Sequence, residues 1–482
     1  MLLPWVLEEM KTADLKDKRL DARLREVLSQ LGAHPVASIP AACGGHAEMT
    51  AAYRFFDNEK VTFDSVLQPH QAATRKRLDT QDIAVLVQDT TEMDLTRPGE
   101  QVAGAGPLDG SARYGLLLHL LTAFTPDGTP LGTLAAHTWV RDEQAVRTAS
   151  LSRAQRAAMP LAEKESYRWI ETLQQAQTLA ADMPRTRLIC VADSEADIYE
   201  LLVAGQTEPR SVEWIVRACQ NRALASATQN AACAREQALA QEVLFRQSIT
   251  VRGRQSKVSC ESRGRRQPRE SRQAEVEVRA AHVTLRPPWR PDQKLPPISL
   301  QVVVVREAEP PPGEEPVEWL LLTSLPVDDV EQVRQVIQYY CTRWMIEIFF
   351  RTLKQGCRVE ERRFEHIDRL LPCVALFLTV AWRTLYVCRL SRSLPDVSCE
   401  SVFEPSEWKA VYRVVRGEIP PSEPPPLSEM VRLVAQLGGY VNRPRKDPPG
   451  PQTVWVGLQR MRDFALCWDL FGPEAKTQQQ LV

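Results

Sequence analysis

The stretch of fifteen residues from Tyr340 to Lys354 constrains this chain more than any other part of its sequence. Counted from the tyrosine, polar residues recur at offsets of 3, 7, 11 and 14, which on an α-helix places them along one stripe. The stripe carries a phenol, two guanidiniums, an ammonium and a single carboxylate: Tyr340, Arg343, Glu347, Arg351 and Lys354. It is either an ordinary salt-bridged helix surface or a phosphodiester site, with cations for the phosphate and a carboxylate for a metal.

A single carboxylate cannot hold the metal pair that in-line phosphoryl displacement uses, so further ligands must come from elsewhere in the chain. The apolar run from Ile83 predicts a buried strand that ends at Asp89, on the exposed C-terminal edge. A second apolar run delivers Asp193 in the same way, and Glu195 and Asp197 then open a helix where its dipole favours acids. Strand-end acids often only cap the next turn, but two of them together with Glu347 point to a three-carboxylate site.

With these residues the chain resembles the DDE transposases that carry the YREK signature, a bacterial insertion-sequence family of the cut-and-paste type. The best-known member of that family mobilises a kanamycin-resistance composite transposon. The resemblance rests on three motifs: Asp89-Thr-Thr, Asp193-Ser-Glu-Ala-Asp197 and the spacing of Tyr340, Arg343, Glu347 and Lys354. It extends over nearly the whole chain, to Ala52–Asn58 in the N-terminal segment, Trp319–Ser324 before the signature helix and Leu437–Tyr440 near the C-terminus.

The resemblance implies a cut-and-paste DNA transposase in which Asp89, Asp193 and Glu347 bind two Mg²⁺ or Mn²⁺ ions. Hydrolysis would nick the transposon end, the freed 3′-hydroxyl would form a hairpin on that end, and a second hydrolysis would open it before joining to target DNA. The implied partners are double-stranded DNA, both the inverted-repeat ends and the target, and a second copy of the chain in a homodimeric DNA complex.

The resemblance also implies a set of DNA contacts. Tyr340, Arg343 and Lys354 would hold the phosphate near the cleaved end, and Arg351 shares their stripe. Trp319 matches a tryptophan that stacks on a flipped base, although a plain core tryptophan is the alternative. The remaining carried-over contacts are Arg217 and Arg222 in the catalytic region and Arg19, Arg23 and Arg54 in the N-terminal region.

Charge alone singles out one further stretch. Between Arg246 and Arg272 lie nine basic residues against two acidic ones, although the chain as a whole has a net charge of −1. A DNA enzyme needs a local electrostatic footprint rather than a basic average. We therefore expect Arg263, Arg265 and Arg266 to contact DNA, with a merely solvated loop as the alternative.

The order of predicted elements indicates an α/β fold with a ribonuclease-H-like mixed sheet. Two apolar runs flank the turn signal Pro126-Asp-Gly128 as an antiparallel meander, and a helix from Leu161 to Ala180 leads to the next strand at Arg187. We predict a helical DNA-end-binding domain over residues 1–70, a catalytic domain over 71–390 with a β-rich insertion over about 205–318, and a helical dimerisation region over 391–482. Asp328 and Glu331 predict the start of the signature helix, and Gly356 its end.

Composition excludes several classes of protein. The eleven cysteines form no CxxC pair, so we expect neither a zinc ribbon nor a disulfide framework. We expect reduced thiols instead, as in a cytosolic protein. The N-terminus lacks the features of a signal peptide. The longest apolar run, Leu370 to Trp382, is too short to span a bilayer and predicts a buried helix, so we expect no membrane partner and a cytoplasmic protein of the bacterial cytosol or nucleoid.

Two other functions remain open from the sequence. One is a catalytically silent or domesticated end-binding protein that inhibits transposition, although all three acids and the N-terminal segment are present. The other is a hydrolase of the glycosidase kind with Asp193 and Asp197 as its carboxylate pair, in which the cationic stripe would have no role.

Overall fold

The computed structural model describes residues 2–99, 101–109, 112–142, 155, 159–206, 212–228, 231–253, 269–290, 293–441 and 447–473. Its N-terminal region is helical, as α2 illustrates. Asp17 caps this helix by accepting a hydrogen bond from the Arg19 N–H, and leucines and a valine on one face are buried. The helices are α1 (Pro4–Glu9), α2 (Lys18–Ala33), α3 (Ile39–Cys43), α4 (His46–Phe56) and α5 (Phe63–Leu78).

The central sheet has the strand order β4-β3-β1-β5-β6, in which an antiparallel meander is followed by parallel pairs. This order confirms the predicted ribonuclease-H-like mixed sheet. Its strands are β1 (Ile83–Asp94), β3 (Tyr114–Phe124), β4 (Pro130–Trp139), β5 (Arg187–Ala192) and β6 (Glu213–Arg217), with the short β2 (Gly106–Pro107) beside β3. The connecting helices are α8 (Tyr167–Asp182) and α9 (Tyr199–Ala204), with 3₁₀ turns at Leu161–Glu163 and Ser194–Ala196.

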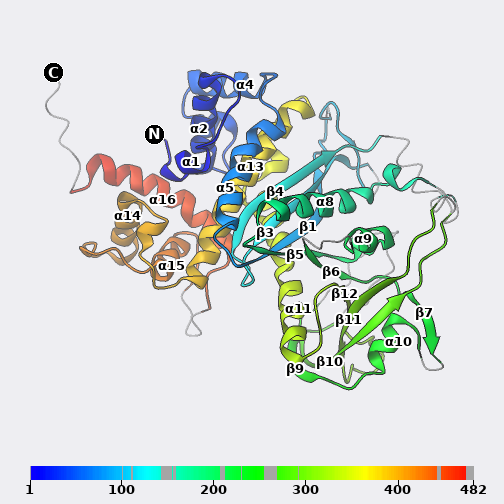
Figure 1. Cartoon of the computed structure of the whole chain (residues 1–482). Helices are drawn as coiled ribbons and strands as arrows, with labels where there is room; N and C mark the ends of the chain where they lie inside the picture. The colour runs from blue at the N-terminus through cyan, green and yellow to red at the C-terminus, as the bar shows by residue number, and fades with distance from the viewer. Residues whose placement is uncertain are drawn as a thin grey trace, which may run out of the picture.

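The strands that follow β6 extend the same sheet to twelve strands, because β12 pairs antiparallel with β6 and the next strands pair outward from it. Figure 1 shows this part in green at the lower right. Its elements are β7 (Ala223–Thr228), β8 (Ala231–Cys233), α10 (Ala234–Leu239), β9 (Phe245–Val251), β10 (Arg272–Leu285), β11 (Ile298–Glu307) and β12 (Glu318–Thr323). The domain boundaries given above stay predictions.

The signature segment is helical, but it is not one uninterrupted α-helix. It consists of α11 (Val330–Thr342), α12 (Trp344–Arg351) and a π-turn over Thr352–Gly356. The predicted cap was one residue early, since Asp329 rather than Asp328 accepts the Gln332 N–H at 2.9 Å. A 3₁₀ turn (Val359–Glu361), α13 (Ile367–Ser393), a 3₁₀ turn (Cys399–Ser401), α14 (Pro405–Arg416), α15 (Leu427–Leu437) and α16 (Pro451–Phe471) complete the described chain.

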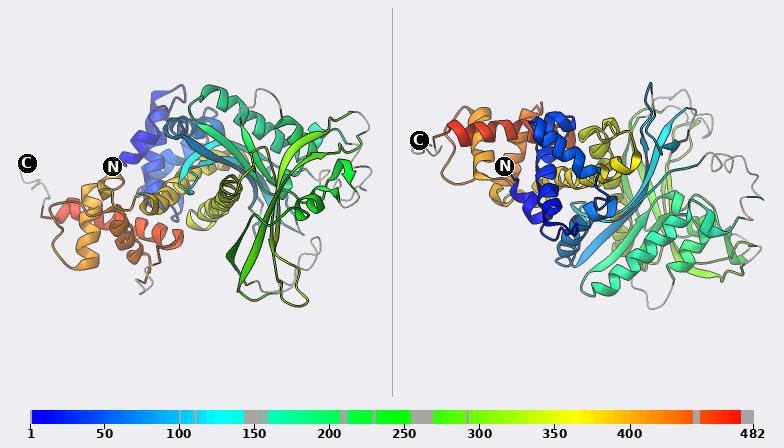
Figure 2. Two further views of the ribbon diagram at one scale, coloured as in Figure 1. Left: turned by 60° about the horizontal axis from the view of Figure 1, so that its bottom comes forward. Right: turned by 90° about the horizontal axis from the view of Figure 1, so that it is seen from above.

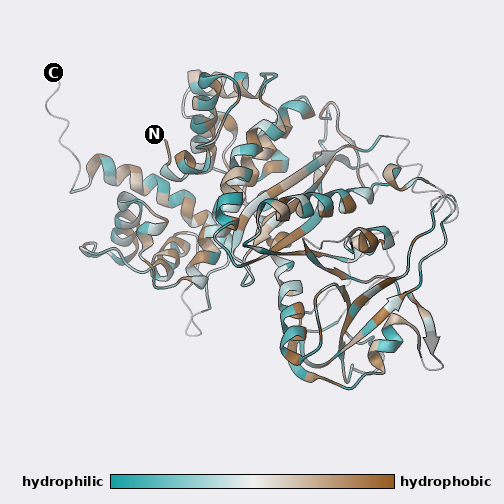
Figure 3. Ribbon diagram, in the orientation of Figure 1, coloured by the Kyte–Doolittle hydropathy of each residue, from teal (hydrophilic) through white to brown (hydrophobic). Residues whose placement is uncertain are grey.

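The sheet separates two helical layers. Val85 and Val87 of β1 face a core shared with α5 and the helices from α11 to α13, whereas Leu86 faces a core shared with α8 and α9. Figure 2 shows these layers from two further sides, and Figure 3 shows apolar residues along the strands and mixed apolar and polar residues on the helices. The N-terminal helices and α16 lie side by side against α13, although they are opposite ends of the sequence.

Helix α13 is the one described helix long and apolar enough to cross a membrane. However, 83% of that apolar window is buried inside the protein, which confirms the predicted buried helix around Leu370 to Trp382.

Candidate active site

Two aspartates are placed side by side by the ends of a parallel strand pair. The pairing of β1 with β5 runs as far as Val87 opposite Val191, and β5 stops at Ala192, so Asp89 and Asp193 follow it at the same level. The expectation that β1 itself ends at Asp89 was wrong. The strand continues to Asp94 because its other edge stays paired with β3, where Asp89 is opposite Leu120.

Glu347 of the signature helix is linked to Asp89 by hydrogen bonds from one arginine, Arg343. Arg343 donates from Nη1 to Asp89 Oδ2 at 3.3 Å and from Nη2 to Glu347 Oε1 at 2.8 Å. Asp89 and Glu347 therefore lie on either side of the Arg343 guanidinium. Asp89 is 254 residues from Arg343 in the sequence, and Glu347 is 4 residues from it. Asp193 completes the cluster, because its negative charge and that of Glu347 both act on Asp89.

The environment of Asp89 disfavours the ionised form of its carboxyl group. Burial, then the charges of Asp193 and Glu347, raise its pKa to about 7, against the opposing effects of Arg343 and the Thr90 N–H. The donors are all carboxylate oxygens, the ligands that Mg²⁺ and Mn²⁺ prefer. A divalent cation would offset the repulsion, so the residues fit such an ion. Within the described ranges no three His, Cys, Asp or Glu side chains form a ready-made cage, and Arg343 lies between two of the acids.

This raised pKa predicts an unusual dependence of stability on pH. Between the ordinary pKa of 3.8 and about 7, folded Asp89 keeps a proton that the unfolded chain has lost. In metal-free protein its contribution to the free energy of unfolding should therefore fall by up to about 1.4 kcal/mol per pH unit across that window. Asp89→Asn should flatten this slope in urea unfolding at pH 5, 6 and 7, with Asp94→Asn as the control. Parallel curves for wild type and Asp89→Asn would contradict the assignment.

Lys354 lies along the continuation of β1 rather than pointing at the three acids. Its ammonium donates to the Glu92 carbonyl and lies 3.4 Å from Glu360 Oε1, which also accepts the Asp94 N–H at 2.9 Å. The π-turn over Thr352–Gly356 moves Lys354 out of the regular helical stripe. The sequence analysis did not identify Glu360 as a partner of Lys354. The only sequence feature that could have indicated it is the position of Glu360 shortly after the signature.

An aromatic pair lies beside the acids. The Tyr340 side chain is buried and meets the Trp319 ring edge-on, with centroids 5.5 Å apart. Burial raises the pKa of Tyr340, whereas the nearby Arg343 and Arg217 lower it. Arg217 also donates to the Glu318 carbonyl at 3.4 Å. The structure thus brings these four predicted contacts together, while Arg351, the last residue of α12, is exposed.

Arg222 has a different environment from the one expected of a DNA contact. Its guanidinium donates to Asp197 Oδ1 at 2.5 and 2.9 Å, while Asp197 Oδ2 accepts the backbone N–H groups of Cys219 and Gln220, each at 2.9 Å. Both side chains are almost fully buried. Asp197 therefore ties the loop after β6 to the segment carrying Asp193. Because its oxygens are taken up by four hydrogen bonds, Asp197 does not fit the glycosidase alternative.

The N-terminal arginines line one shallow groove. Arg19, Arg23 and Arg54 surround a hollow of about 600 Å³ between α2 and α4. Arg19 pairs with Asp17 at 3.1 Å and Arg23 with Glu26 at 2.7 Å, while Arg54 is exposed. Arg263, Arg265 and Arg266 lie outside the described residues, so their predicted role stays a prediction.

Comparison with known protein families matches most of the chain. Residues 3–61 match a family described as transposase DNA-binding, residues 170–370 a transposase DDE domain, and residues 379–467 a transposase Tn5 dimerisation domain. Among solved structures, a piggyBac transposase synaptic complex with hairpin DNA matches with a TM-score of 0.32 and 11% sequence identity. That match covers 68% of this chain and spans about half, 52%, of the other.

Proposed function

This chain belongs to the Tn5-like DDE transposases, and from that premise we propose that it excises a DNA element by a cut-and-paste route and joins it to target DNA. It is a metal-dependent enzyme acting on DNA. Two observations support the proposal most: Arg343 hydrogen-bonds both Asp89 and Glu347, and Asp193 follows β5 at the level of Asp89. The alternative of a silent end-binding protein is not favoured.

Asp89, Asp193 and Glu347 would hold two Mg²⁺ or Mn²⁺ ions. Such ions supply Lewis-acid stabilisation of phosphate oxygens and lower the pKa of a bound water. The chain's own contribution is to orient the substrate. Arg343, which bridges two of the acids in the free protein, would turn one side of its guanidinium to the phosphate, and Lys354 would bind a neighbouring phosphate from the β1 side.

We further propose that cleavage passes through a hairpin on the element's end. Trp319 supports this step, because its ring is only partly buried and stands edge-on to Tyr340 beside the acids, where an extruded base could stack. Incubation of the protein with its own flanking DNA and Mg²⁺ tests the route. Denaturing gels should show a nick, then a hairpin, then a blunt end. Double-strand breaks without a hairpin would overturn the route but leave the enzyme class intact.

The proposed partners are the inverted-repeat ends, the target DNA and a second copy of the chain within the DNA complex. The last turns of α16 leave Leu466, Leu470 and Phe471 exposed, with Phe471 at 83%, which supports a contact between copies there. The proposed compartment is the bacterial cytosol, where the DNA is.

The basic stretch from Arg246 to Arg272 gives a prediction about salt. If it binds phosphates, neutralising Arg263, Arg265 and Arg266 together should weaken binding to cognate and scrambled duplexes by similar factors. Each lost contact should also flatten the slope of log K against log[salt] by about 0.9. Fluorescence anisotropy at several salt concentrations measures both effects. An unchanged slope would indicate a solvated loop, and loss for the cognate end alone would indicate base reading.

A further inference from the structure

Side chains of described residues cover the backbone of the edge strand β4 along its first half only. Along its first half, side chains replace the missing neighbouring strand. Trp382 Nε1 donates to the Pro130 carbonyl at 3.0 Å and Arg77 Nε to the Leu131 carbonyl at 2.6 Å, while the Thr133 N–H donates to His70 Nε2 at 3.0 Å. Blocking an edge in this way prevents other chains from pairing with it.

Among the residues that the structure describes, none covers the second half of β4 in this way. After a bulge near Thr133, Ala135 to Trp139 pair with β3 on one side. On the other side, no hydrogen bond from any residue that the structure describes reaches their backbone. Alternate residues of an edge strand point both N–H and C=O away from the sheet, so within the described part of the chain this half presents donors and acceptors without a backbone partner.

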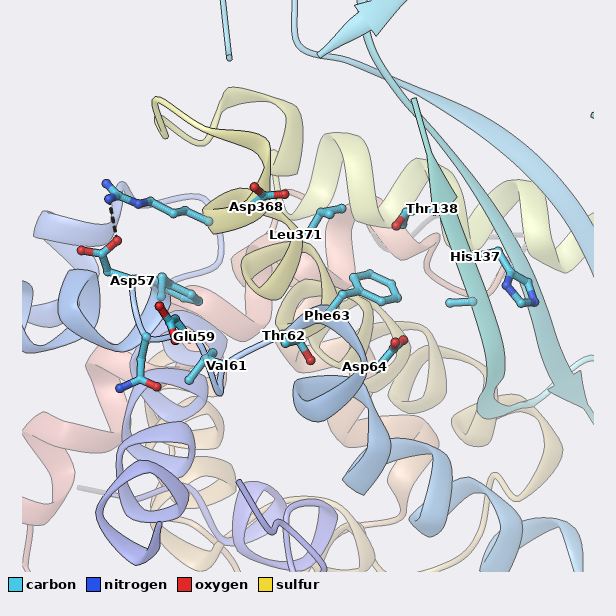
Figure 4. A pocket seen from close by; sticks show the side chains of 14 residues that line it. Asp57, Glu59, Val61, Thr62, Phe63, Asp64, His137, Thr138, Asp368 and Leu371 are labelled. Carbon is cyan, nitrogen blue, oxygen red and sulfur yellow. Dashed lines mark ion pairs between the residues drawn. The ribbon is translucent and has the colours of Figure 1, made fainter. Parts of the chain in front are cut away.

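The open half forms the floor of a groove. Two adjoining hollows, of about 410 and 630 Å³, share Asp64, Ala136 and His137. The first has walls from α5 and α8, including Gln175, which lies 3.2 Å from His137 Nε2. The second is shown in Figure 4, between the loop that leads into α5, the start of α13 and β4. Its lining combines the apolar side chains of Phe56, Val61, Phe63 and Leu371 with polar and charged ones.

The net charge of the groove's lining residues indicates which kind of partner it can bind. The two hollows are lined by five acidic residues and two arginines: Asp57, Glu59, Asp64, Asp182 and Asp368 against Arg75 and Arg369. Arg369 is paired with Asp57 at 2.6 Å. The excess negative charge repels nucleic acid and favours a cationic partner. A strand-shaped floor with unpaired backbone groups favours an extended peptide over a helix.

We propose that the groove along β4 binds a basic, extended segment of a partner protein by strand addition. The backbone of the segment pairs with Ala135 to Trp139, its alternate apolar side chains lie against Phe63 and Leu371, and its lysines or arginines face Asp64 and Asp182. This is a protein-docking site on the side of the sheet edge, separate from the DNA-processing acids.

The test uses the full chain and a fluorescein-labelled heptapeptide, Lys-Val-Lys-Val-Arg-Val-Lys, followed by anisotropy. Two control peptides carry either N-methyl groups on alternate backbone nitrogens or glutamate in place of each basic residue. The groove variant is Asp64→Lys with Asp182→Lys. Its matched control, Asp79→Lys with Glu171→Lys, reverses two exposed acids on or beside the same two helices but outside the groove. Circular dichroism confirms that each variant folds.

We expect the heptapeptide to bind wild type and the matched control equally, and the groove variant at least about tenfold more weakly. Both control peptides should bind at least about tenfold more weakly than the heptapeptide. Equal binding of the N-methylated peptide would overturn strand addition, and equal binding by both variants would overturn the groove. Sedimentation showing that the heptapeptide dissociates a dimer of the chain would make a second copy, not a partner protein, the occupant and overturn that part of the proposal.

Discussion

Glu347→Gln should abolish DNA cleavage while leaving binding to the element's ends nearly unchanged. The amide keeps the shape of the side chain and can still meet Arg343, which now lies 2.8 Å from Glu347 Oε1. It removes the negative charge that would hold a metal ion. Metal-ion stabilisation of the transition state is worth several kcal/mol, so we expect cleavage to fall by about 10³-fold or more. Single-turnover cleavage in Mg²⁺ and anisotropy with a labelled end duplex measure the two quantities separately.

The matched control is Glu361→Gln, the same chemical change on a glutamate that pairs with Arg358 at the surface. Its cleavage rate should stay within about a factor of two of wild type, as expected for a surface ion pair. Residual Mg²⁺-dependent nicking by Glu347→Gln at a rate comparable to the control would remove Glu347 from the active site. Equal loss of end binding and cleavage would mean that the substitution acts through DNA binding instead.

Asp197→Ala should be the most destabilising single substitution near the active site. It leaves the Arg222 guanidinium buried without its carboxylate and removes the acceptor of two backbone N–H groups. Breaking a buried ion pair from one side costs about 3–5 kcal/mol, so the midpoint of urea unfolding should fall sharply. Arg222→Ala should cost a similar amount, because Asp197 then becomes the unpaired buried charge.

The control for the predicted cost of Arg222→Ala is Arg187→Ala, which also removes an ion-paired arginine. Arg187 pairs with Glu213 at 2.5 Å on the same sheet, but its side chain is 43% exposed, so its loss should cost less than about 1 kcal/mol. If Arg222→Ala were as mild as Arg187→Ala yet weakened DNA binding, the carried-over DNA contact would be correct and the structural role wrong.

Local sequence patterns predicted the parts of the site that depend on the burial of apolar runs and on helical periodicity. The apolar runs before Asp89 and Asp193 form buried strands because nothing else can bury them, and the stripe from Tyr340 is helical. Where β1 ends could not be read from its own residues, because its pairing with β3 decides that. The bond between Asp197 and Arg222 joins residues 25 apart and depends on two loops meeting, which no periodicity records. The π-turn at Lys354 likewise replaces a regular turn that the spacing predicted.

The continuous sheet has a consequence for which nucleotide can be processed. Asp193 follows β5 and Trp319 lies in β12, with only β6 between these two strands. Two strand spacings amount to about 10 Å, and a ladder of hydrogen bonds keeps them constant. If Trp319 receives an extruded base, the sheet therefore acts as a ruler between that base and the phosphate that is cut. Changes in loop length would leave this measure intact, whereas a strand inserted between β5 and β12 would shift the cut along the DNA.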